Sequence, residues 1–368
     1  MPKPKVYFTN MWVSDDENQQ AKMKRLIRTA GFGSIDFERK YAAVKIHFGE
    51  MGNLSYLRPN YARTVVDLIK EQGGKAFLTD ANTLYVGYRK NALDHMDTAY
   101  TNGFSPFSTG CHIIIADGLK GTDEVLVPVP NGELVKKAKI GRAVVDADIL
   151  VSLTHFKGHE LTGIGGAVKN IGMGCGSRAG KMEQHTNGKP VVDKRVCIGC
   201  GKCVKTCAVA APKVTNGKAT IDHQLCVGCG RCIGVCPTDA IEATGSNSND
   251  DLSKRMAEYA VAACDGKPHF HISLVMQVSP ECDCHESNDV SIVPDVGMFA
   301  SFDPVALDQA CADMVNKQPI QIGSSLERAD DTTKDYFTRI HPETDWHVHL
   351  DHAAKLGLGR TDYDLVEI

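Results

Sequence analysis

The sequence has no apolar run approaching about 18 residues and no long run of like charge. A helix needs about 20 apolar residues to cross a membrane, and nucleic-acid binding usually leaves a basic patch. We therefore expect neither a membrane span nor a nucleic-acid partner. The first residues also lack the apolar core of a signal peptide, so we expect a cytoplasmic protein. The sequence leaves its oligomeric state open.

Cysteine, by contrast, is abundant, and most of the 14 cysteines fall in residues 196–237. They form two runs of the pattern C-x₂-C-x₂-C-x₃-C, and thiolates are the ligands that iron–sulfur clusters select. In such runs the first three thiolates bind one cluster and the fourth binds the other. We therefore predict two [4Fe–4S] clusters, one held by Cys197, Cys200, Cys203 and Cys236, the other by Cys226, Cys229, Cys232 and Cys207.

Both runs resemble those of bacterial two-cluster ferredoxins, although Ala208 stands where that pattern has a proline. Structural zinc is the alternative, but zinc sites use two pairs of ligands and not four cysteines in each run. The resemblance implies a small α+β ferredoxin unit that suits an anaerobe. It also implies an external redox partner such as a ferredoxin or flavodoxin.

The rest of the chain alternates apolar strands with amphipathic helices, which indicates an α/β domain with a mainly parallel sheet. We expect this domain to comprise residues 1–187 and 246–368, with the ferredoxin unit inserted at 188–245. His47, Asp80 and His155 each follow a predicted strand. Because ligands bind at the carboxyl ends of parallel strands, we expect these side chains to share a site. Near the C-terminus, His347, His349 and His352 belong to a histidine-rich group that could trap a metal at the surface, but we favour a solvated tail there.

A glycine-rich stretch over residues 163–176 follows one of these strands. Its glycines, with Gly163, Gly165 and Gly166 at the start, could offer backbone N–H groups to an anion. A turn that is rich in glycine for steric reasons is the alternative, and neither reading predicts a helix. His159 and Lys169 flank the first glycines, and we include both among the candidate catalytic residues.

A further candidate is Cys282, Cys284 and His285, which lie just beyond a predicted buried strand. Two thiolates and an imidazole could bind one additional metal, although C-x-C is tighter than the usual zinc spacing. Alternatively the two cysteines form a redox-active dithiol, or they are ordinary reduced thiols in a loop.

Five stretches together resemble the DUF362 family, in the form that carries an inserted ferredoxin domain: residues 45–50, 79–85, 117–118, 155–174 and 293–308. The family implies no settled activity.

Residues 159–169, followed by His185, also resemble lactate racemase, in which a lysine tethers a nickel-pincer nucleotide and a later histidine binds nickel. This second resemblance would place the cofactor on Lys169 and His185.

Our leading hypothesis is an iron–sulfur oxidoreductase whose clusters pass electrons to a site in the α/β domain. A non-enzymatic electron carrier or docking subunit is one alternative, and a redox-neutral enzyme related to lactate racemase is another. The sequence leaves open whether the chain is an enzyme. It also leaves open the substrate, the direction of electron flow and the cluster potentials.

Overall fold

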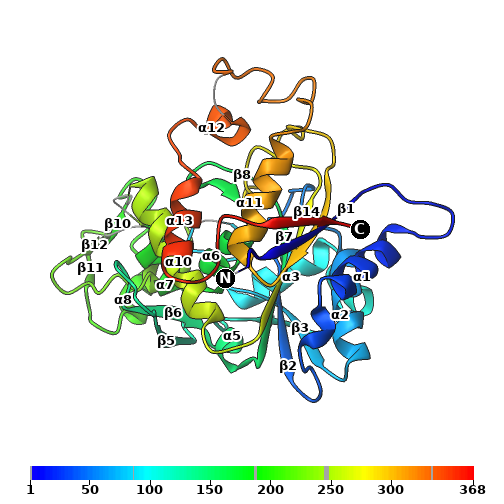
Figure 1. Cartoon of the computed structure of the whole chain (residues 1–368). Helices are drawn as coiled ribbons and strands as arrows, with labels where there is room; N and C mark the ends of the chain where they lie inside the picture. The colour runs from blue at the N-terminus through cyan, green and yellow to red at the C-terminus, as the bar shows by residue number, and fades with distance from the viewer. Residues whose placement is uncertain (1, 86, 186–188, 244–247, 333–334) are drawn as a thin grey trace.

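The computed structural model describes residues 2–368 apart from 86, 186–188, 244–247 and 333–334. At the centre of the described chain is an eight-stranded sheet in the order β16-β1-β15-β14-β7-β2-β3-β4 (Figure 1). Its strands are β1 (Lys5–Asn10), β2 (Tyr41–Lys45), β3 (Lys75–Asp80), β4 (Ile113–Ile115), β7 (Ile149–His155), β14 (His269–Val275), β15 (Gly297–Ser301) and β16 (Asp364–Glu367). Within this sheet only β15 runs against its neighbours. The predicted α/β class with a mainly parallel sheet is confirmed.

Both faces of the sheet are covered, because successive side chains of a buried strand point to opposite faces. Leu150 of β7 joins one apolar cluster and Val151 joins the other. The Val151 face is covered by α1 (Gln19–Thr29), α2 (Pro59–Glu71), α3 (Ala92–Thr101) and α4 (Pro106–Thr109), and the Leu150 face by α5 (Arg142–Asp146), α6 (Ala167–Cys175), α10 (Asn249–Cys264), α11 (Pro304–Val315) and α13 (His347–Lys355). None of the described helices is long and apolar enough to cross a membrane.

Helix α6 corrects the expectation that the glycine-rich stretch is a non-helical turn. Its glycines allow close packing: a Cβ at Gly172 would overlap the carbonyl oxygen of Met256 on α10, and one at Gly174 would overlap the Lys45 side chain. Glycine costs about 1 kcal/mol relative to alanine in a helix, and tertiary packing offsets that cost here. The glycines therefore bring α6 against the sheet and α10.

Asp308 of α11 holds the amino end of α6 in place. Its carboxylate accepts hydrogen bonds from the N–H groups of Ala167 at 2.7 Å and Val168 at 2.9 Å, and it is fully buried. We expect Asp308→Ala to lower the free energy of unfolding by about 2 kcal/mol, because two buried donors lose their acceptor. Urea denaturation measures the change, with exposed Asp362→Ala as the control. An equal loss in both variants would contradict this role.

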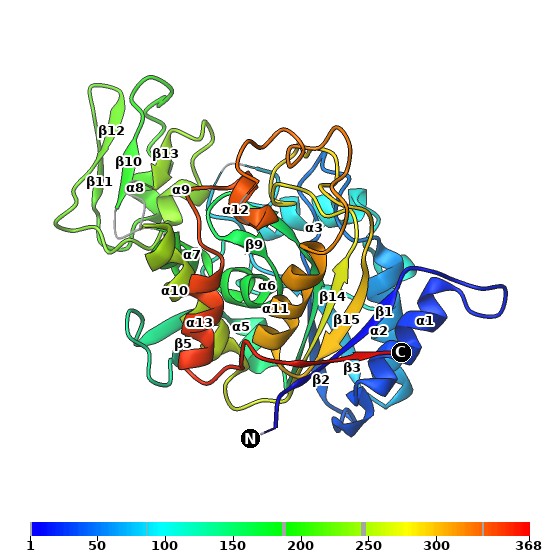
Figure 2. The same ribbon diagram turned by 45° about the horizontal axis from the view of Figure 1, so that its top comes forward.

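The cysteine-rich segment forms a separate lobe at one side of the sheet (Figure 2). It consists of two small antiparallel sheets, β10 (Pro190–Val192) with β13 (Ile241–Ala243) and β11 (Pro212–Thr215) with β12 (Lys218–Ile221), and of the short helices α8 (Lys202–Thr206) and α9 (Arg231–Gly234). Each helix follows a glycine with positive φ, Gly201 or Gly230, which reflects the repeat in the sequence. The boundaries expected at 187/188 and 245/246 involve residues outside those described.

The remaining elements connect the layers or complete them. They are the 3-10 helix η1 (Phe32–Ser34), α7 (Arg178–His185) and α12 (Tyr336–Ile340), with two hairpins made of β5 (Glu124–Pro128) with β6 (Lys137–Gly141) and β8 (Lys157–His159) with β9 (Gly163–Gly165). The C-terminal segment is not a solvated tail. His349 on α13 is fully buried, and β16 pairs with β1 at the edge of the sheet.

Candidate functional site

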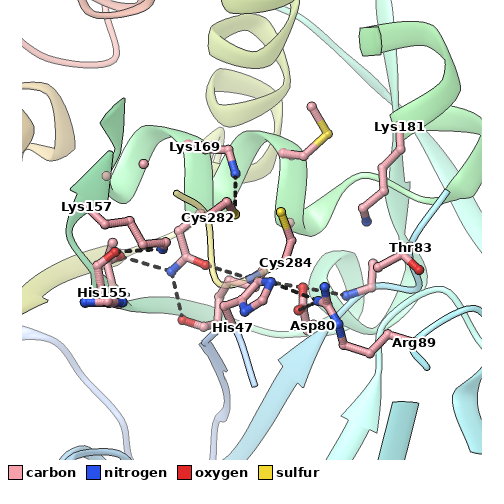
Figure 3. A pocket seen from close by; sticks show the side chains of 18 of the residues that line it. His47, Asp80, Thr83, Arg89, His155, Lys157, Lys169, Lys181, Cys282 and Cys284 are labelled. Carbon is pink, nitrogen blue, oxygen red and sulfur yellow. Dashed lines mark hydrogen bonds and ion pairs between the residues drawn. The ribbon is translucent and has the colours of Figure 1, made fainter. Parts of the chain in front are cut away.

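The carboxyl ends of β2, β3 and β7 open into a cleft of about 570 Å³, counted with the solvent at its mouth (Figure 3). Of the residues singled out in the sequence, those that line the cleft are His47, Asp80, His155, Gly165, Gly166, Lys169, Cys282 and Cys284. Gly163 instead lies against Trp346, and His185 against the ring of Tyr85. The shared edge of the sheet therefore does bring together side chains from distant parts of the chain.

Buried ion pairs form one wall of the cleft. The Lys45 ammonium lies 3.0 Å from a carboxylate oxygen of Asp80 and donates to Asn170 Oδ1 at 2.7 Å. Burial alone would raise the pKa of Asp80, but the nearby Lys45, His47, His95 and Lys181 together outweigh it and lower that pKa below its usual value. Beside them, Arg89 pairs with Glu50 at 3.0 Å. Asp80 is therefore held ionised, as the counter-charge of Lys45.

His155 is tied into a second buried network. Its Nδ1 lies 2.9 Å from Asp283 Oδ2, and its Nε2 lies 2.8 Å from the carbonyl oxygen of Met276. The Lys157 ammonium is 3.2 Å from the same Asp283 carboxylate. With both ring nitrogens engaged, His155 positions the loop that carries Asp283. It has no nitrogen left to bind a metal.

Cys282 has several polar neighbours in the cleft. Its Sγ, the Sγ of Cys284 and a ring nitrogen of His159 lie within 4.8 Å of one another. The Lys169 ammonium donates to Cys282 Sγ at 3.5 Å. The hydrogen bond from the Cys284 thiol, together with the nearby Lys169 and His159, lowers the pKa of Cys282 well below its usual value. The same hydrogen bond raises the pKa of Cys284, so the pair is a thiolate beside a thiol.

The tautomer of His159 bears on what this group can bind. The backbone N–H of Leu161 donates to His159 Nδ1 at 3.0 Å, so in the neutral ring the proton sits on Nε2. This N–H donates to Cys282. A histidine that binds metal through one nitrogen normally carries its proton on the other, which here accepts a hydrogen bond. The three side chains are close enough to hold a metal ion, but the hydrogen bonds suit a thiolate better.

His285 does not join Cys282, in contrast to the set expected from the sequence. It is exposed, and its Nε2 lies 3.1 Å from Glu160 Oε1. Glu160, Cys284 and His285 form a second group whose ligand atoms lie within 4.8 Å of one another. Sequence proximity is a poor guide here because residues 282 and 285 lie on opposite sides of a turn, in which the N–H of His285 bonds to the carbonyl of Cys282.

In the cysteine-rich lobe, Cys197, Cys200, Cys203 and Cys236 line one cavity. It joins the first three cysteines of one run to the fourth of the other, which is the set that the sequence assigns to one cluster. Cys226 and Cys229 are half-buried, and Cys232 is buried on α9. The four free thiols around the cavity at Cys197 equal the number of ligands that one four-iron cluster requires.

Several residues that line the cleft were not predicted as site residues from the sequence: Lys45, Thr83, Tyr85, Arg89, Lys157, Asn170 and Lys181. Lys45 and Lys157 could have been found, since each lies two residues from a candidate histidine. Arg89 could not, because nothing in its loop marks it and its role depends on Glu50, 39 residues away.

The comparisons with known proteins concern the family and the fold. The family model described as "Domain of unknown function (DUF362)" matches residues 42–313. The lactate racemase apoprotein from Thermoanaerobacterium thermosaccharolyticum is similar with a TM-score of 0.35 and 12% identity, over 73% of this chain and 50% of that one. A structural genomics target from Thermotoga maritima is similar with a TM-score of 0.38 and 12% identity, over 83% of this chain and 60% of that one. This chain thus spans about half of the first structure and 60% of the second. No curated protein matches it.

Proposed function

The chain belongs to the DUF362 family, whose description assigns no activity, and we propose from its geometry that it is an iron–sulfur oxidoreductase. The observation that carries this proposal is the thiolate–thiol pair of Cys282 and Cys284 in a cleft beside a lobe with eight cysteines. Two [4Fe–4S] clusters, when bound by that lobe, supply electrons one at a time. The cysteine pair accepts two of them and reduces a small substrate in the cleft.

The cysteine pair can alternate between a disulfide and a dithiol. Reduction breaks the bond between the two sulfurs and consumes two electrons and one proton. One proton stays on Cys284, and the Lys169 ammonium and the His159 N–H stabilise the thiolate that forms on Cys282. The thiolate–thiol pair then gives two electrons and the Cys284 proton to an oxidised substrate, which takes a second proton from solvent, and the disulfide forms again. The electrons come from an external one-electron donor, such as a ferredoxin or flavodoxin.

The arrangement of donors around Cys282 favours this reading over a plain electron carrier. A carrier needs clusters but no polarised thiolate in a separate cleft. Buried cysteines without such a role are protonated and inert; Cys264 is an example, because burial raises its pKa. Cys282 is equally buried, yet its pKa is lowered.

Metal and acid-labile sulfide analysis of anaerobically purified protein tests the proposal. We expect about eight irons and eight sulfides per chain, both in the wild-type protein and in a Cys282→Ala/Cys284→Ala variant, because neither cysteine belongs to the lobe. A chain without iron and sulfide would contradict the clusters. A further metal that is present in the wild type and lost in the variant would contradict the dithiol, and would indicate a metal-dependent reaction in the cleft.

A further inference from the structure

The two sets of cluster cysteines have different surroundings. The cavity lined by Cys197, Cys200, Cys203 and Cys236 has walls that come entirely from residues 197–241. Cys200 is exposed at its rim, and the side chain of Ile198 is 64% exposed. A cluster held there would face solvent and an external partner.

The other set lies against the α/β domain, through helix α9. A Cβ added to Gly230, at the start of α9, would come 3.3 Å from Leu84 Cδ1 and 3.2 Å from Arg178 Cγ. Leu84 is buried, and its apolar cluster contains Cys232 as well as Cys197 and Cys203, so the close approach of Leu84 and Arg178 to Gly230 is what sets the Cys232 side apart. Figure 2 shows α9 on the side of the lobe that faces the core. The loop and helix that carry Cys229 and Cys232 thus contact the domain that holds the cleft.

Residues 83–85 continue this contact into the cleft. Thr83 and Tyr85, the two neighbours of Leu84, both line it. The side chain of Tyr85 lies close to the Cys284–Cys282 pair, and its interaction with these two sulfurs raises the pKa of Tyr85 well above its usual value. Three consecutive residues therefore contact α9 at one point and the cysteine pair at another. No such contact appears in the lining of the cavity around Cys197.

Arg178 places a positive charge at the same contact. Arg178 is 1% exposed, and its guanidinium donates to the carbonyl oxygens of Lys120 at 2.6 Å and of Lys90. The guanidinium also lies against Gly234, where an added Cβ would overlap it. The neighbouring cavity is lined by Lys90, Lys120 and Arg231 as well. Reduction adds a negative charge to a cluster, and nearby positive charge and burial tune its reduction potential. A cluster beside Arg178 is therefore easier to reduce.

We propose that the cluster held by Cys226, Cys229, Cys232 and Cys207 is the exit cluster, which hands electrons through residues 83–85 to the Cys282–Cys284 pair. Arg178 is a positioning residue that also sets the potential of this cluster above that of the other. Electrons then enter at the solvent-facing cluster and run downhill to the exit cluster. This inference rests on the proposed function and adds an order of electron transfer to it.

A redox titration of the anaerobic holoprotein, followed by electron paramagnetic resonance, tests this order. We expect Arg178→Met to lower the midpoint potential of one cluster and to leave the other unchanged. Arg178→Lys keeps the charge and should retain the wild-type potential. Arg195→Met is the matched control: it removes an exposed arginine that pairs with Asp193 near the other cysteine run, and it should leave the higher-potential cluster unchanged. The Cys229→Ser substitution should alter the paramagnetic resonance signal whose potential depends on Arg178. The Cys200→Ser substitution should leave that signal unchanged.

Three results would overturn the inference. Arg178→Met could shift both potentials equally or neither, or the shifted signal could follow Cys200 and not Cys229. In each case two clusters would still be present, so the proposed function would survive. The absence of any reduced-cluster signal would overturn the proposed function and this inference together.

Discussion

A Cys282→Ser variant is expected to take up about two electrons per chain in an anaerobic reductive titration, where the fully oxidised wild-type protein takes up about four. Serine occupies nearly the same volume but cannot form a disulfide with Cys284, so only the two clusters remain as acceptors. The rate of substrate reduction should fall on the order of 10³-fold or more, as when an enzyme loses its nucleophile. Electron uptake is measured by coulometry.

The control for this experiment is Cys111→Ala. Cys111 is a buried thiol outside the cleft, and its variant should still take up about four electrons. Alkylation of the reduced and oxidised proteins, followed by peptide mass analysis, should show Cys282 and Cys284 joined only after oxidation. An unchanged uptake in Cys282→Ser would show that the second pair of electrons goes elsewhere, and would refute the dithiol.

The parts of the fold that the sequence predicts well are those set by apolar periodicity and by strand ends. The strand over 149–155 begins with the apolar run Ile149–Val151, and all of its residues are buried because both of its faces are covered. His47, Asp80 and His155 lie together because parallel strands end at a common edge. For the same reason the sequence places the cleft correctly without any knowledge of its lining.

The helical conformation of α6 and the burial of the C-terminal segment could not be predicted from local sequence patterns. The glycines of α6 lower its helix propensity, and the reason for them is Met256, more than eighty residues away. His349 is buried by elements distant in the chain, although its own segment is rich in charge. Likewise the sequence pairs His285 with the cysteines beside it, whereas His159 is the histidine that donates to Cys282. Each of these errors concerns a contact between distant segments, which local patterns do not encode.

Lys169 makes the second large contribution to the chemistry proposed for the cleft. Its ammonium lies 3.5 Å from Cys282 Sγ, and after the hydrogen bond from Cys284 it is the strongest influence that lowers the pKa of Cys282. A Lys169→Met variant keeps a long apolar side chain but removes the charge. The pKa of Cys282 should therefore rise, and less of it should be thiolate at neutral pH. A hydrogen bond to a charged group contributes about 1.5–3 kcal/mol, which shifts the thiolate–thiol equilibrium of Cys282 by roughly 10- to 100-fold, so alkylation of Cys282 by iodoacetamide should slow by up to that factor on the acidic side of the titration curve.

The pH profile separates this electrostatic effect from a structural one. Since a thiol with a lowered pKa stays ionised down to that pKa, wild-type Cys282 should react at an almost constant rate across neutral pH, with a loss only on acidification. In Lys169→Met the whole curve should move to higher pH, and the rate should recover in alkaline solution. Lys139→Met removes a lysine that pairs with Glu183 away from the cleft and should leave the curve unmoved. A slow rate in Lys169→Met that does not recover at high pH would mean that the substitution closes the cleft, and that the Lys169 charge does not activate Cys282.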